Sequence, residues 1–98
     1  EKMVLDGSEK IISEKHPIFF IEIELRHTSK INIDSLFQIM NKNNYNCYYF
    51  FSDIFIPMKL DYFNLKNIQN NKKEYINNFL FLNRNHHIHL INKYMNEK

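Results

Sequence analysis

Several residue types are rare or missing in this sequence, and their scarcity excludes whole classes of function. The 98 residues include no alanine, one glycine and one cysteine. Without a glycine-rich segment, the chain carries no phosphate-binding or dinucleotide-binding loop of the common kinds. The single Cys47 excludes an internal disulfide and is typical of a reducing compartment, so we expect a cytoplasmic protein. No apolar run approaches the roughly 20 residues of a membrane-spanning helix, so we expect no membrane partner.

The charges are nearly balanced. Lys and Arg number 13 against 11 Asp and Glu, which leaves a net charge of +2. Because no long basic stripe accompanies this small excess, we expect no nucleic-acid partner. A hydrophobic fraction of 44% is that of a globular chain, and the length limits residues 1–98 to one domain. We expect residues 84–98 to form a terminal tail or helix.

The segment 17–24 joins a run of apolar residues to two carboxylates, Glu22 and Glu24. A continuous apolar run opened by proline predicts a strand over 18–25 that is buried on both faces, as in parallel sheets covered by helices. Open α/β sheets place their ligands at the carboxyl ends of such strands. Glu22 and Glu24 therefore belong either to a ligand-binding site or to an ordinary strand end.

Apolar spacing predicts a helix on each side of this strand. Residues 2–15 carry apolar side chains at helical spacing. This helix should end at His16-Pro17, because the residue before proline avoids the helical region. Residues 33–42 form the second helix, with Asn32 as its N-cap and Asn43-Asn44 as its end.

Further elements follow toward the C-terminus. We expect an aromatic-rich strand over 45–51, a loop with a short helical turn over 52–75, a strand over 79–82 and a terminal helix over 86–96. Pro57 argues against a long element in the loop region. The alternation of helix and strand in the first half is the βαβ pattern of a parallel sheet.

Three short groups of residues, spread over residues 1 to 83, are informative when taken together and in order. The first group is Val4-Leu5-Asp6-Gly7-Ser8 followed by Pro17-Ile18 and Glu22-Ile23; the second is Asn43-Asn44-Tyr45, and the third is Phe79–Leu82. Together they resemble the C-terminal part of FkbM-family methyltransferases, which use S-adenosylmethionine. In that family a V-L-x-G-A helix leads into a P-I-L-x-x-E-I strand. Here Ser8 replaces the alanine, and Asn44 replaces a glycine before Tyr45.

The resemblance implies a place in a larger fold. Family members are Rossmann-like, with seven strands in the order 3-2-1-4-5-7-6 and an antiparallel strand 7. On that map residues 18–25 are strand 5, 45–51 strand 6 and 79–82 strand 7, with the helices over 2–15 and 33–42 on one face. The glycine-rich cofactor loop would lie upstream of Glu1. The resemblance thus implies a partial domain with two parallel strands and one antiparallel strand. Its second sheet face and one strand edge would be exposed and could support self-association.

The resemblance also implies a function. We expect methyl transfer from S-adenosylmethionine to an oxygen of a small molecule or glycan in the intact enzyme, with no cofactor bound by this chain alone and no activity. Glu22 matches the family's glutamate at the end of strand 5, where it could hold the acceptor hydroxyl or act as general base. The alternative is a non-catalytic α/β binding or assembly module.

Other polar residues have simpler interpretations. Glu22 could instead pair with a cation such as Arg26, Glu24 is expected to be a solvated rim charge, and His27 a surface-loop residue. His86, His87 and His89 have a spacing that suits metal binding, but no further ligand completes a set, so we expect polar surface residues and no metal.

The aromatic strand over 45–51 surrounds the cysteine. We expect Cys47 to be a buried structural residue, since no His or Asp is patterned with it. Its Tyr and Phe neighbours could serve as a base-stacking platform, but the low net charge favours a role in the sheet core.

Overall fold

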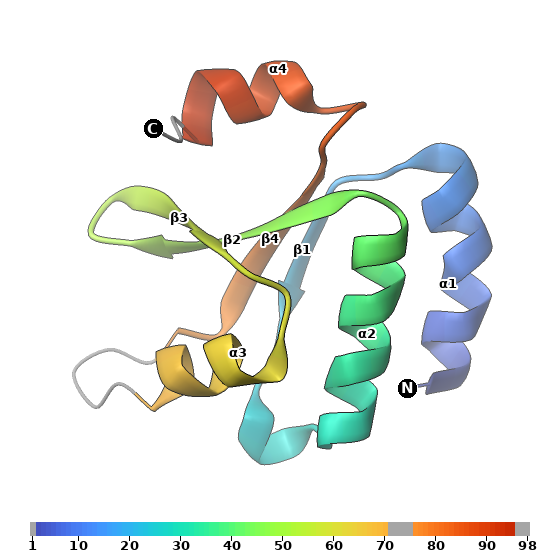
Figure 1. Cartoon of the computed structure of the whole chain (residues 1–98), viewed down its shortest axis with the longest axis vertical. Coiled ribbons are helices and arrows are strands. Elements are labelled where there is room, and N and C mark those ends of the chain that lie inside the picture. Colours follow the sequence, from blue (N-terminus) through green and yellow to red (C-terminus); the bar gives the residue numbers. More distant parts are fainter. Residues whose placement is uncertain (1, 71–75, 96–98) are drawn as a thin grey trace.

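The computed structural model describes residues 2–70 and 76–95, which form a small α/β domain with one four-stranded antiparallel sheet (Figure 1). The N-terminal half contains α1 (Lys2–Lys15), β1 (Phe19–Glu22), the 3-10 turn η1 (Leu25–His27), α2 (Lys30–Lys42) and β2 (Tyr45–Phe51). The C-terminal half contains β3 (Ile54–Met58), α3 (Tyr62–Gln69), β4 (Asn78–Asn83), α4 (Ile88–Leu90) and η2 (Ile91–Met95). The helix expected over 2–15 is confirmed, and so are strands at 45–51 and 79–82.

The strands lie in the order β1-β4-β2-β3, and every neighbouring pair is antiparallel. The parallel sheet expected from the alternation of helix and strand is therefore wrong. β1 and β2 both pair antiparallel with β4, so they run in the same direction, but they share no hydrogen bonds because β4 lies between them. The helix–strand alternation could not reveal this, since β4 comes from a segment more than 25 residues further along the chain.

β1 is shorter and less buried than the expected strand over 18–25. Its side chains alternate between half-buried and exposed, and Phe20 is 67% exposed. The prediction of burial on both faces is wrong because β1 is an edge strand with one covered face. The register places Phe19 opposite Phe81 on the covered face and Phe20 opposite Leu80 on the other.

The region expected to be a loop over 52–75 contains a strand and a helix. A two-residue turn at Ser52 and Asp53, with φ values of 50° and 65°, joins β2 to β3. Positive φ at both positions is the geometry of a tight hairpin turn. Pro57 does not prevent β3, because an edge strand tolerates a residue without an N–H group. Residues 71–75 of that expected loop lie outside the described residues.

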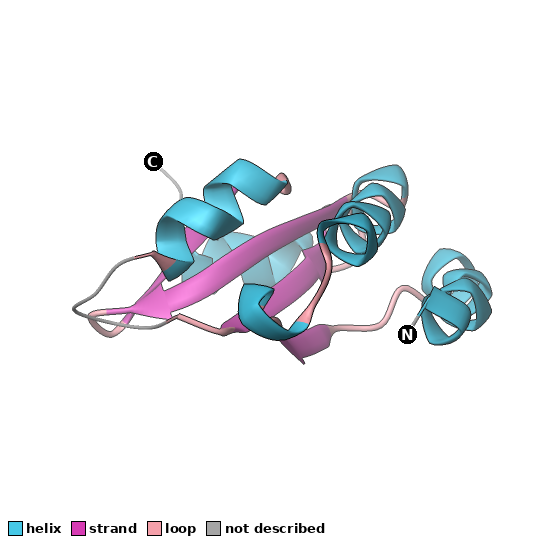
Figure 2. Ribbon diagram, turned by 90° about the horizontal axis from the view of Figure 1, so that it is seen from below, coloured by secondary structure: helices cyan, strands magenta, loops and turns pink. Residues whose placement is uncertain are grey.

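One face of the sheet, here called the first face, is covered by three helices. Its core combines Ile12 of α1, the buried side of α2 and Leu65 of α3 with the inward side chains of the strands, among them Tyr45, Cys47, Phe79 and Phe81. α1 and α2 run side by side (Figures 1 and 2). α2 begins three residues earlier than expected, because the Ser29 hydroxyl, not Asn32, accepts the capping hydrogen bond. It ends at Lys42 as expected, with Asn43 as its C-cap and Asn44 following at a φ of 64°.

The second face is partly covered by the C-terminal helical segment, α4 with η2. Ile91 and Met95 pack with Tyr48 and Leu82 in a second, smaller core, and η2 lies against β3. The expectation that helices lie on one face only, leaving the whole second face exposed, is therefore wrong. Phe20 still projects from this face at the β1 edge. Within the described residues, no helix combines the length and apolar character needed to cross a membrane.

Candidate functional site

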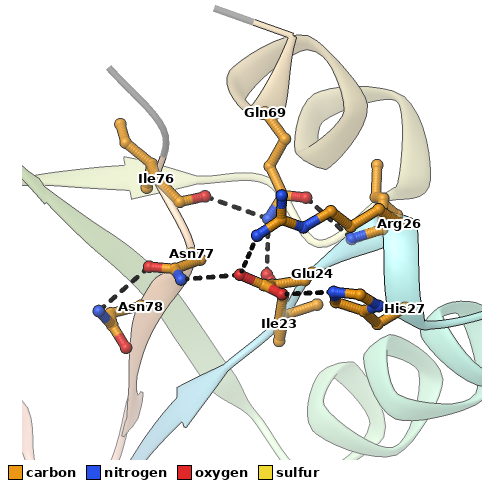
Figure 3. A network of polar contacts seen from close by, with 9 residues as sticks. Ile23, Glu24, Arg26, His27, Gln69, Ile76, Asn77 and Asn78 are labelled. Atoms are coloured by element: carbon orange, nitrogen blue, oxygen red, sulfur yellow. Dashed lines mark hydrogen bonds and ion pairs between the residues drawn. The ribbon is translucent and has the colours of Figure 1, made fainter.

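The chain leaving β1 is held by a network of polar contacts around Gln69 (Figure 3). The Gln69 amide donates to the backbone oxygens of Ile23, at 2.6 Å, and Ile76, at 3.1 Å. Its side-chain oxygen accepts the backbone N–H of Leu25 at 3.0 Å. One buried side chain on α3 thus satisfies backbone groups on both sides of the β1 exit and before β4, where no ladder partner is available.

Glu24 is the charged centre of the same network. Its carboxylate accepts from Asn77 Nδ2 at 3.1 Å and pairs with Arg26 and His27 at 3.3 Å each. The hydrogen bond from Asn77 and the nearby Arg26 charge lower the pKa of the Glu24 carboxyl, against a smaller opposing effect of desolvation. The side chain is only 14% exposed, so the expected solvated rim charge is wrong. His27, expected as a surface-loop residue, is exposed but belongs to this network.

Glu22 is the last residue of β1, two residues before Glu24. It is exposed, alternates with Ile21 and Ile23, and shares the second face with Phe20. Arg26, the partner suggested for Glu22, pairs with Glu24 instead. Among the described residues, the Glu22 carboxylate forms no hydrogen bond or ion pair, so it is available at the end of β1.

The C-terminal histidines meet a fourth histidine from the α1–β1 connection. The rings of His16 and His86 stack with centroids 3.9 Å apart and planes 17° from parallel. His87 Nδ1 accepts the backbone N–H of Asn83 at 2.8 Å, and desolvation with the neighbouring His86, His89 and His16 lowers the pKa of His87. These residues therefore join two segments of the fold. Within the described residues, no three His, Cys, Asp or Glu side chains are grouped to hold a metal ion.

A cleft of about 290 Å³ opens at the other end of β2 from the Glu24 network. It is lined by Asn41, Tyr45, Asn46, Cys47, Pro57, Met58, Lys59, Leu60 and Arg84. Arg84 is held at its rim by Asn44 and Asn46. The cleft therefore brings two cations beside an apolar floor.

Cys47 and its aromatic neighbours mostly have structural roles. Burial raises the pKa of the Cys47 thiol, and the residue is 2% exposed, which confirms the expected buried cysteine. Tyr45 and Tyr48 are buried as expected, and the Tyr45 hydroxyl donates to the Pro17 carbonyl at 2.6 Å. Phe50 is an exception, because it is half exposed beside Phe55.

In comparisons with known proteins, no family model, no curated protein and no solved structure matches this chain. The geometry nevertheless reveals three residues that the sequence pattern did not single out: Gln69, His16 and Arg84. Gln69 gave no local signal, since its backbone partners at Leu25 and Ile23 lie 44 and 46 residues away. Arg84 is one of two arginines in a lysine-rich chain, which was a signal that could have been used.

Proposed function

We propose that this chain is the C-terminal part of an S-adenosylmethionine-dependent methyltransferase domain that methylates an oxygen of a small molecule or glycan. The observation that supports the proposal best is the strand order β1-β4-β2, with β4 antiparallel to both neighbours. The methyltransferase order ends in strands 5-7-6, with strand 7 antiparallel. β1, β4 and β2 would take those three places, in the same chain order as the residues that carry the resemblance.

The helices and the sheet edge are consistent with that place. α1 precedes β1, α2 connects β1 to β2, and both helices pack on the first face. β1 is an unpaired edge, where strand 4 of a complete sheet would bind. Ile18 and Phe20, 50% and 67% exposed, lie beside that edge and would be covered by the rest of the domain. The hairpin strand β3 and the C-terminal helical segment are additions to the family pattern.

Glu22 would act on the acceptor. In methyl transfer a hydroxyl oxygen attacks the methyl carbon, the carbon–sulfur bond breaks, and the sulfonium becomes a neutral thioether. The hydroxyl proton must be removed, and a carboxylate at the end of a strand with no internal partner can accept it. The Glu24 network holds the adjacent backbone still, so it would position Glu22 without contacting the acceptor.

Two measurements test the proposal. The coding sequence immediately upstream of Glu1 should contain an acidic D-x-E-G segment and, further back, a glycine-rich loop; their absence would overturn the proposal. Calorimetric titration of S-adenosylmethionine should show no micromolar binding to this chain alone, but clear binding to the chain joined to that upstream region. Micromolar binding by the 98 residues alone would contradict the partial-domain interpretation.

The role of Glu22 needs its own variant in the joined protein. Glu22→Gln should lower kcat by about 100-fold or more with little change in cofactor affinity, as expected for loss of a general base. Glu14→Gln, an exposed carboxylate on α1, is the matched control and should leave kcat unchanged. A joined protein that binds no cofactor but forms a discrete complex with another macromolecule would favour the non-catalytic binding module.

A further inference from the structure

We propose that the cleft beside Arg84 binds a small organic anion, a carboxylate or a phosphate monoester with a compact apolar body. This inference is independent of the methyltransferase proposal, because the cleft lies at the start of β2, away from the β1 exit. It rests on a held arginine, a second cation and an apolar floor in one cleft.

Arg84 is held in place by neutral groups. Its guanidinium donates to Asn46 Oδ1 at 3.1 Å and to Asn44 Oδ1 at 3.0 Å. Its own backbone N–H donates at 2.8 Å to the carbonyl oxygen of Asn44, the left-handed residue that follows α2. Because amide oxygens carry no net charge, these bonds orient the guanidinium without neutralising it. Further N–H donors of the guanidinium's five remain for a ligand.

The rest of the lining supplies a matching charge and surface. Lys59, the residue after β3, lines the cleft, and among the described residues it forms no ion pair. No carboxylate is among the described residues that line the cleft, so its formal charge is positive. Cys47, Met58 and Leu60 form the apolar floor of the cleft. An anion bound here would place its charged end on Arg84 and its apolar body against that floor. The planar guanidinium fork fits carboxylate and phosphate oxygens.

Size restricts the ligand further. Pockets for drug-sized ligands usually span about 300–1,000 Å³. At about 290 Å³ the cleft lies at the lower limit of that range, which favours a single small ring or short chain over a nucleotide.

The test is an NMR titration of the isotope-labelled 98-residue chain with phenyl phosphate and with benzoate. At least one anion should give saturable shifts at the backbone amides of Arg84, Lys59 and Asn46. Benzyl alcohol, which has the same ring without the charge, should give none. Absence of saturable shifts with both anions, or equal shifts with benzyl alcohol, would overturn the proposal.

Variants locate the binding energy. Arg84→Gln should weaken anion binding by about tenfold or more, because it removes a charge-assisted hydrogen bond. Arg84→Lys should recover only part of this, since a point charge cannot replace the guanidinium fork. If Arg84→Gln unfolds, Lys59→Gln serves as the test: it breaks no side-chain hydrogen bond or ion pair among the described residues, and it should weaken anion binding several-fold. Lys66→Gln on α3 is the matched control and should bind normally. Unchanged binding by Lys59→Gln and by any folded Arg84 variant would contradict the site.

Discussion

His87 and Asn83 are joined by a hydrogen bond in which the imidazole is the acceptor. The backbone N–H of Asn83, a residue 2% exposed, donates to His87 Nδ1 at 2.8 Å. A ring nitrogen can accept only while it carries no proton. Desolvation and the charges of His86, His89 and His16 lower the pKa of His87, against an opposing backbone hydrogen bond with His16. The connection between β4 and the C-terminal helical segment is therefore sensitive to acid.

The first prediction follows from the pKa of His87, which is lowered in the folded chain from its ordinary value of 6.5. As pH falls below about 6.5, the unfolded chain takes up the proton first, so the free energy of unfolding declines until the pH passes the lowered folded pKa. Urea denaturation at several pH values between about 7.5 and 5, which span the titration of an ordinary histidine, should show this loss of stability. His87→Gln should reduce the loss, whereas His27→Gln, outside the cluster, should retain it.

The second prediction concerns Gln69. Gln69→Ala leaves two carbonyl oxygens and one N–H near the β1 exit without their partner. Since an unsatisfied buried polar group costs about 1–3 kcal/mol, the free energy of unfolding should fall by about 2–3 kcal/mol. Gln38→Ala, at an exposed position on α2, should change it by less than about 0.5 kcal/mol. Equal effects of the two variants in urea denaturation would contradict the role assigned to Gln69.

The third prediction tests the second core. Ile91 is 7% exposed between η2 and the second face, whereas Ile88, one turn earlier, is 48% exposed. Ile91→Ala should lower the free energy of unfolding by about 2 kcal/mol or more through lost burial and a new cavity. Ile88→Ala should cost less than about half as much, because less of its surface is removed from water. Similar losses in both variants would mean that the helical segment does not pack on the sheet as described.

The fourth prediction concerns the β1 edge. The outer edge of β1 has no partner strand in the sheet and carries an exposed phenylalanine, so the chain alone should self-associate as its concentration rises. Phe20→Lys should shift the sedimentation profile toward monomer. Phe63→Lys on α3 replaces an equally exposed phenylalanine away from the edge and should leave the profile unchanged. A monomeric parent chain at all concentrations would remove the basis for this prediction.

The fifth prediction concerns Cys47. Cys47 is buried in β2, and this burial also raises the pKa of its thiol. In the folded chain, Cys47 should therefore be unreactive toward a disulfide reagent at about pH 8, near the ordinary pKa of a free cysteine. Reaction should become rapid in urea, so the rate in native buffer reports opening of the sheet. Rapid labelling without denaturant would show that β2 is accessible.

Local patterns in the sequence predicted several elements well. The apolar face of residues 2–15 and the proline after His16 predicted α1, and the aromatic run at 45–51 predicted β2 and a buried Cys47. These predictions succeeded because helix and strand periodicity is a property of neighbouring residues. β3 was missed because Pro57 is a breaker in a central strand but is tolerated at an edge. Sequence alone cannot tell which strand will be the edge.

The sequence by itself determined several of the helices and strands, among them α1 and β2, together with one buried thiol and the lack of a common nucleotide loop. Only the tertiary structure decided that β4 separates β1 from β2, that Glu24 is engaged while Glu22 remains open, and that Arg84 is held beside an apolar cleft. Each of these depends on groups brought together from distant parts of the chain, such as Glu24 and Asn77, 53 residues apart. Periodicity describes adjacent residues, whereas such partners are selected by the packing of the whole fold.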